Sequence, residues 1–192
     1  MMRFFWVRHG PTHAKGMVGW SDLPADLSDS AQIARLSEYL PDDALLISSD
    51  LTRSIATADA IAAGRQRLPH DPDLREMNFG EWELKSSADI TATHPELSRV
   101  FWTDPGAHAA PGGESWAEMT TRSGRAVERL MQAHPGRDIV AVAHFGVILA
   151  RVAAQTGQPV RQVLAHKIAN FSVTELRWTS AEWQLGAINH LP

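Results

Sequence analysis

The most constraining feature of the chain is a short apolar run that ends in a cation, an imidazole and a glycine. Residues 4–7, Phe-Phe-Trp-Val, are aromatic and β-branched, which is typical of a buried strand. Arg8, His9 and Gly10 follow directly. Open α/β sheets bind ligands at the carboxyl ends of central strands. The run therefore predicts a polar site at a sheet edge, with an arginine fork suited to phosphate or carboxylate.

Two further apolar runs end in the same way. Residues 44–47 lead into the polar residues 48–50, and residues 138–143 lead into His144. Arg53 follows one turn into the helix expected after the second of these strands. Each polar end could be incidental when taken alone, His144 as a structural histidine for example. Together they predict two arginines and two histidines that converge on an anion of about two charges, for which phosphate fits best.

The rest of the chain alternates helical and strand patterns, and Ser28 is the expected cap of the first helix. Helices are expected over about 28–40, 51–63, 116–134 and 147–155, short helices within 86–110, and further strands at about 172–178 and 182–188. Strands that alternate with helices favour a parallel sheet covered on both faces. The sequence thus predicts one domain over residues 1–192 with a three-layer α/β/α fold and a mostly parallel central sheet.

Composition narrows the class of protein. A net charge of −4 gives no support for nucleic acid or a membrane surface as a partner. The absence of cysteine excludes disulfides and thiolate chemistry and is compatible with a cytoplasmic location. No apolar run approaches the roughly 18 residues of a membrane span. We expect a cytoplasmic protein whose partner is a small molecule; the sequence predicts no oligomeric state.

Five blocks carry a resemblance to a known family. They are RHGPT at 8–12, SDLTRSIATA at 49–58, LRE at 74–76, GEWE at 80–83 and VAHFG at 142–146. In this order they resemble the histidine phosphatase superfamily, which has the phosphoglycerate-mutase-like fold. The run LREMNFGEWE at 74–83 looks most like the α-ribazole phosphatase branch.

The resemblance implies a metal-independent phosphomonoesterase, a hydrolase without a cofactor. His9 would form a phosphohistidine, which requires a neutral imidazole; an ordinary pKa of about 6.5 provides this at pH 7. Glu76 would protonate the leaving alkoxide. The implied groups that bind the phosphoryl oxygens are Arg8, Thr12, Arg53, His144 and Phe145. No metal ligand is expected, because no two histidines show helical i, i+4 spacing with a third ligand.

Alternatives remain for the function and for one role. The substrate is expected to be a small phosphorylated metabolite, with α-ribazole phosphate the candidate that the branch suggests. A phosphoglycerate mutase, or a binding module that holds phosphate without turnover, are the other interpretations. Glu83 is a rival to Glu76 as the acid. The chain departs from the family pattern at four places: Lys15 replaces a common Asn, Leu84 and Phe145 each replace a common Gly, and Ser30-Ala31 stands where a Gly is common in the first helix.

Overall fold

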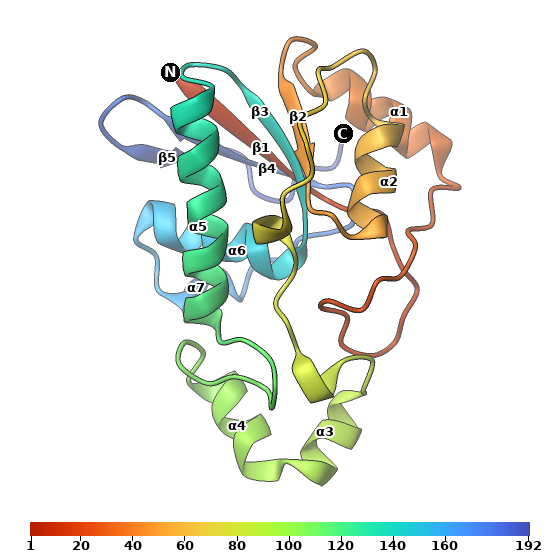
Figure 1. Cartoon of the computed structure of the whole chain (residues 1–192), viewed down its shortest axis with the longest axis vertical. Coiled ribbons are helices and arrows are strands. Elements are labelled where there is room, and N and C mark those ends of the chain that lie inside the picture. The colour runs from red at the N-terminus through yellow and green to blue at the C-terminus, as the bar shows by residue number, and fades with distance from the viewer.

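A computed structural model describes residues 1–192 and contains one five-stranded sheet (Figure 1). The strands are β1 Met2–Arg8, β2 Leu45–Ser48, β3 Ile139–Ala143, β4 Val173–Trp178 and β5 Trp183–Leu185. Their order across the sheet is β2-β3-β1-β4-β5. The central strands β2, β3 and β1 are parallel, and β4 and β5 join antiparallel on the other side. The predicted mostly parallel sheet is confirmed in its centre.

The register of the parallel strands brings the predicted polar ends together. Arg8 at the end of β1 pairs with Ala143 of β3, and Ser48 of β2 pairs with Val142. His144 and His9 are the next residues on their strands, so they leave the sheet at the same edge. The convergence expected from the sequence therefore follows from the pairing itself.

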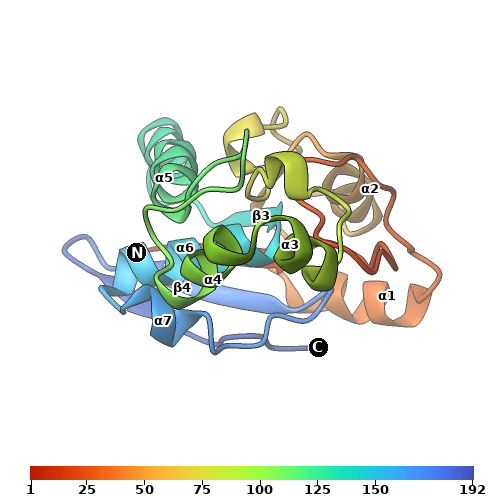
Figure 2. The same ribbon diagram turned by 90° about the horizontal axis from the view of Figure 1, so that it is seen from below.

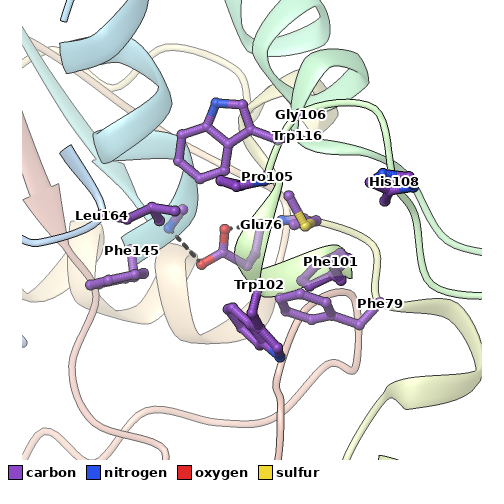
Figure 3. A pocket seen from close by; sticks show the side chains of 12 residues that line it. Glu76, Phe79, Phe101, Trp102, Pro105, Gly106, His108, Trp116, Phe145 and Leu164 are labelled. Atoms are coloured by element: carbon purple, nitrogen blue, oxygen red, sulfur yellow. Dashed lines mark hydrogen bonds between the residues drawn. The ribbon is translucent and has the colours of Figure 1, made fainter. Parts of the chain in front are cut away.

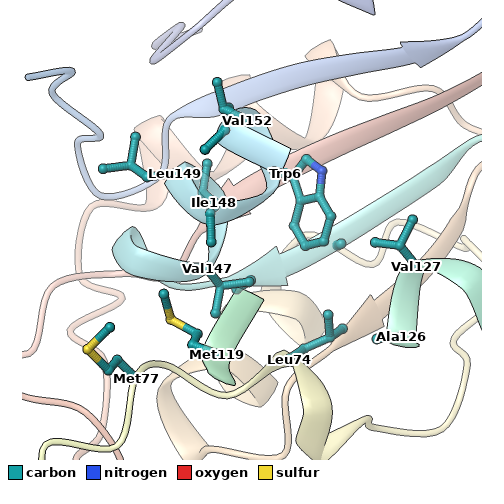
Figure 4. Packing of buried hydrophobic residues seen from close by; sticks show 14 of the residues in the cluster. Trp6, Leu74, Met77, Met119, Ala126, Val127, Val147, Ile148, Leu149 and Val152 are labelled. Atoms are coloured by element: carbon teal, nitrogen blue, oxygen red, sulfur yellow. The ribbon is translucent and has the colours of Figure 1, made fainter. Parts of the chain in front are cut away.

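Helices cover both faces of the sheet, as predicted (Figures 1 and 2). Alternate residues of β1 point to opposite faces, which is the period of a strand. Phe4 and Trp6 join the core with α5 (Trp116–Ala133) and α6 (Phe145–Thr156), part of which Figure 4 shows. Phe5 and Val7 pack with α1 (Ser30–Tyr39) and α2 (Thr52–Ala60) on the other face.

The remaining elements lie beyond the carboxyl edge of the sheet or beside α6. Two short helices, α3 (Ser87–Thr93) and α4 (Pro95–Thr103), form the lower end of the molecule in Figure 1. A third, α7 (Val160–Val163), contacts α6, and single 3₁₀ turns occur at Pro72–Leu74 and Gly80–Trp82. None of the helices is both long and apolar enough to cross a bilayer.

Some boundaries differ from the sequence prediction. The cap of α1 is Asp29, not Ser28, because the Asp29 carboxylate accepts from the backbone N–H of Gln32 over 3.0 Å. The helix predicted to begin at residue 147 begins at Phe145, directly after the strand-end histidine. This earlier start places the N-terminal N–H groups of α6 at the site.

Candidate active site

His9 follows β1 directly, and only 7% of its surface is exposed. Its Nδ1 lies 2.6 Å from the carbonyl oxygen of Gly10, and the Nε of Arg53 donates to its Nε2 over 3.2 Å. A carbonyl only accepts hydrogen bonds, so Nδ1 carries the ring proton. Nε2 therefore keeps its lone pair, and it is the ring atom able to attack phosphorus.

The surroundings of His9 favour the neutral ring. Burial, followed by the charge of Arg53, lowers its pKa from 6.5 to about 3; Arg8 acts in the same direction and the bond to Gly10 opposes it. The folded site therefore keeps the imidazole neutral at pH 7 to a greater extent than an ordinary histidine pKa would.

Arg53 lies in the first turn of α2 and is fully buried. Its terminal nitrogens donate to the carbonyls of Ser21 over 2.8 Å and Gly19 over 2.6 Å, while its Nε faces His9. Thr57, one turn later, donates to the Arg53 carbonyl over 2.7 Å. The guanidinium is thus held in place beside the imidazole, and phosphoryl transfer depends on fixed cations of this kind.

Arg8 is held by a segment from the far end of the chain. Its Nη1 donates to the carbonyl of Ile168 over 2.6 Å, and its guanidinium carbon lies 5.5 Å from the centre of the Phe145 ring. The Arg8 Nε is buried without a protein partner. Asn170 in the same segment donates to the His9 carbonyl over 2.7 Å. Arg8 therefore keeps a donor for an oxyanion while segment 168–170 supports both residues.

His144 is fully buried at the start of α6. Its Nε2 lies 2.8 Å from the hydroxyl of Ser49, and its Nδ1 is buried without a protein partner. The His144 ring centre is 5.0 Å from that of His9. Burial, and then the charges of the neighbouring groups, hold the pKa of His144 well below 6.5. Its unpartnered ring nitrogen is the group available to a phosphoryl oxygen.

Glu76 lies in the wall of a pocket next to these groups (Figure 3). Its carboxyl oxygens accept from the N–H groups of Met77 over 2.9 Å and Gly146 over 3.0 Å. A Cβ at position 146 would lie 2.5 Å from Glu76 Oε1, so a larger residue there would displace the carboxyl group. Burial raises the pKa of Glu76 in spite of both donors. A carboxyl group that holds its proton near a leaving group is suited to act as general acid.

Glu83, the alternative acid, uses its carboxylate to hold backbone N–H groups of residues 19–21 and 79. Its carboxylate accepts from the backbone N–H groups of Gly19, Trp20, Ser21 and Phe79 and from the Ser21 hydroxyl. Burial raises its pKa, but these hydrogen bonds outweigh burial and lower the pKa below the ordinary value. An ionised carboxylate surrounded by donors is poorly suited to protonate an alkoxide.

Other predicted or unusual positions lie as follows. Thr12 is partly exposed and makes no side-chain hydrogen bond. Phe145 meets the site through its ring, which lies against Arg8 and lines the pocket. Lys15 is exposed and has no ion pair. Leu84 adopts a φ of +62°, the left-handed region that favours the glycine usual there. No group of three His, Asp or Glu side chains is placed to hold a metal ion.

Comparison with known proteins gives the family. Residues 4–191 match the histidine phosphatase superfamily (branch 1). The chain belongs to this superfamily. The resemblance found in the sequence is confirmed, and with it the expectation that the protein is a phosphatase of this family.

Named relatives of this histidine phosphatase include two phosphatases. A glucosyl-3-phosphoglycerate phosphatase of Mycolicibacterium vanbaalenii is 34% identical over 171 residues, 82% of this chain and 76% of that protein. An adenosylcobalamin/alpha-ribazole phosphatase of Escherichia coli K12 is 29% identical over 189 residues, 94% of this chain and 90% of that protein. Bacillus stearothermophilus YhfR has the same fold, with a TM-score of 0.90 over 100% of this chain and 98% of that chain at 24% identity.

Three supporting residues of this histidine phosphatase were missed as site residues. In the sequence, Ser49 is only one of several polar residues after a strand, and nothing there indicates that it holds His144. Asn170 and Ile168 contact the motif at positions 8 and 9 from about 160 residues away, and no local pattern signals this. The alternation of strands and helices predicts where each strand ends. It does not predict which loop packs against those strand ends.

Proposed function

We propose that this histidine phosphatase hydrolyses phosphomonoesters of small metabolites through a phosphohistidine on His9. The observation that carries the proposal is the geometry around the His9 ring: Nδ1 faces the Gly10 carbonyl, Nε2 lies 3.2 Å from the Nε of Arg53, and the His144 ring centre lies 5.0 Å away. A phosphoryl group placed there would meet a nucleophile and fixed hydrogen-bond donors together.

The proposed reaction has two displacements. The Nε2 lone pair forms a bond to phosphorus while the bond from phosphorus to the ester oxygen breaks, and Glu76 gives its proton to that oxygen. Water then attacks the phosphohistidine, Glu76 takes a proton from the water, and inorganic phosphate leaves with His9 restored. Arg8, Arg53 and His144 hold the phosphoryl oxygens through both steps, because charge develops there.

The geometry favours an enzyme over a binding module. A module that only held phosphate would need the cations but not a buried carboxyl group with a raised pKa beside them. The mechanism uses no metal, and the expected cytoplasmic location and metabolite substrate stay predictions. The two relatives are named a glucosyl-3-phosphoglycerate phosphatase and an adenosylcobalamin/alpha-ribazole phosphatase, and we retain α-ribazole phosphate as one candidate substrate.

The phosphoenzyme is the direct test. The protein is mixed in EDTA with a ³²P-labelled phosphomonoester, quenched in alkali within milliseconds and counted on the protein. We expect label that is stable in base and lost in acid, as a phosphohistidine is. It should be absent from His9→Ala and present in His134→Ala, which removes a histidine at the far end of α5. Label that persists in His9→Ala would overturn the assignment.

A further inference from the structure

The pocket that contains Glu76 is lined mainly by apolar and aromatic side chains (Figure 3). Five aromatic rings line it, those of Phe79, Phe101, Trp102, Trp116 and Phe145, and Leu164 adds an aliphatic side chain. The cavity is about 110 Å³ in volume. The rings come from four separate parts of the chain, so the fold gathers them at this edge.

Edge-to-face packing fixes part of this lining. Phe101 lies 5.2 Å from Trp82 at 73° and 5.0 Å from Trp102 at 84° between ring planes. Such arrangements are the preferred geometry of aromatic pairs. Trp82 is fully buried behind them, whereas 52% of Trp102 is exposed. Trp102 is therefore the most exposed ring of the pocket lining, and it packs against a ring that is itself held in place.

Cations are absent from the pocket lining. The only basic residues between Leu84 and Pro111 are Lys85 and Arg99, apart from histidines. Neither of them lines the pocket, and Arg99 is paired with Glu96 over 3.0 Å on the surface. The lining residue His108 lies 3.6 Å from Asp104. A second acidic group on a substrate would find no arginine or lysine here beyond those that hold the phosphoryl group.

We propose that this pocket binds the alcohol part of the substrate, and that it selects uncharged alcohols with an apolar or aromatic body. The proposal rests on the proposed function, since Glu76 must protonate the ester oxygen at the pocket wall. An aromatic group would replace water against the rings, and a carboxylate would lose its hydration without a partner. The class excludes phosphoglycerate and its anionic derivatives as preferred substrates.

Three primary alkyl phosphates test the class, because their leaving groups make similar demands on Glu76. They are 2-phenylethyl phosphate, ethyl phosphate and 3-phosphoglycerate. We expect kcat/KM for 2-phenylethyl phosphate to exceed each of the others by about 10- to 200-fold, the range for apolar discrimination in a pocket. Equal values, or a preference for 3-phosphoglycerate, would overturn the proposal.

Variants locate the selectivity. Trp102→Ala should reduce kcat/KM for 2-phenylethyl phosphate several-fold and leave ethyl phosphate unchanged, because only the larger alcohol reaches the ring. Trp102→Lys should raise kcat/KM for 3-phosphoglycerate by supplying a cation. Tyr39→Ala removes an exposed ring at the end of α1, away from the site, and should alter none of the three. A loss on all three substrates with Trp102→Ala would show a structural role and overturn the assignment.

The outcome separates this proposal from the proposed function. If His9 is labelled and kcat/KM is the same for ethyl phosphate and 2-phenylethyl phosphate, the phosphatase mechanism stands and the pocket proposal fails. If no monoester labels His9, both fail together.

Discussion

At His9 burial and charge act on one ring, and the consequence extends to stability. Between pH 6.5 and about 3 the unfolded chain binds a proton at this residue that the folded chain does not. The free energy of unfolding must then fall as the pH falls, by about 1.4 kcal/mol per pH unit for each such histidine. His144 acts with the same sign, since its pKa is also lowered. Glu76 acts with the opposite sign, because its raised pKa weakens the fold as the pH rises above 4.5.

We therefore expect His9→Gln to make stability less dependent on pH. In urea unfolding between pH 4 and 6, the slope of unfolding free energy against pH should be smaller than in the wild type by about 1.4 kcal/mol per pH unit. His134→Gln, which removes a histidine at the end of α5 whose side chain makes no hydrogen bond or ion pair, is the matched control. Comparison of variants cancels the contribution of Glu76. Equal slopes for wild type and His9→Gln would contradict a neutral, buried His9.

The role of Glu76 predicts an effect that depends on the leaving group. Glu76→Gln keeps the size of the side chain but removes the proton that the alkoxide needs. Hydrolysis of an alkyl phosphate should slow by about 10²–10⁴, the usual contribution of a general acid. An activated aryl phosphate, whose phenolate leaves unaided, should lose far less. Equal losses on both substrates would instead assign Glu76 to binding or folding, and a thermal melt of the variant distinguishes these.

At the scale of elements, the turn at residues 19–21 connects the Arg53 guanidinium to the Glu83 carboxylate. Its carbonyls at Gly19 and Ser21 hold the Arg53 guanidinium, and its N–H groups are held by the Glu83 carboxylate. The indole N–H of Trp20 donates to the Glu76 carbonyl over 2.7 Å. A Cβ at position 19 would lie 2.1 Å from the Met77 carbonyl, so glycine is required. Glu83 is thus a positioning residue for Arg53.

Glu83→Gln should weaken the hold on phosphate without changing the chemistry of the leaving group. Replacing the ionised acceptor leaves some of its buried donors poorly paired, at about 1–3 kcal/mol of stability. We expect competitive inhibition by inorganic phosphate to weaken and kcat/KM to fall by a similar factor for alkyl and aryl phosphates alike. Glu81→Gln, an exposed neighbour, should change neither. A loss confined to alkyl phosphates would show Glu83 to be the acid.

The elements themselves could largely be predicted, because their signals are local. Apolar runs and helical patterns indicated β1–β3, α1, α2, α5 and α6, and the polar residue after each central strand indicated the candidate site. The antiparallel direction of β4 could not be predicted, since a strand pattern reads the same in both directions. The strain at Leu84 could not be predicted either. Its positive φ accompanies a hydrogen bond from its N–H to the Met17 carbonyl over 2.7 Å, a contact across 67 positions.

For the molecule as a whole, what covers the sheet edge decides between hydrolysis and transfer. A mutase must keep water from its phosphoenzyme between half-reactions and must hold a second acidic group on the substrate. Here α3 and α4 are the elements beyond that edge, seen from below in Figure 2. The helix α4 adds the rings of Phe101 and Trp102 to the pocket, and neither helix adds an arginine or lysine. A phosphohistidine formed from a substrate such as 3-phosphoglycerate would therefore have no firmly bound carboxylic acid beside it to accept the phosphoryl group back.

We expect hydrolysis without interconversion. The protein is supplied with 3-phosphoglycerate and a catalytic amount of 2,3-bisphosphoglycerate, and inorganic phosphate and 2-phosphoglycerate are followed together. Phosphate should appear, slowly, and 2-phosphoglycerate should not, because water reaches the phosphohistidine before a charged acceptor can bind. His9→Ala gives the background for both products. Efficient interconversion with little free phosphate would mean that α3 and α4 close over the site and that the charge of the pocket lining does not set the outcome.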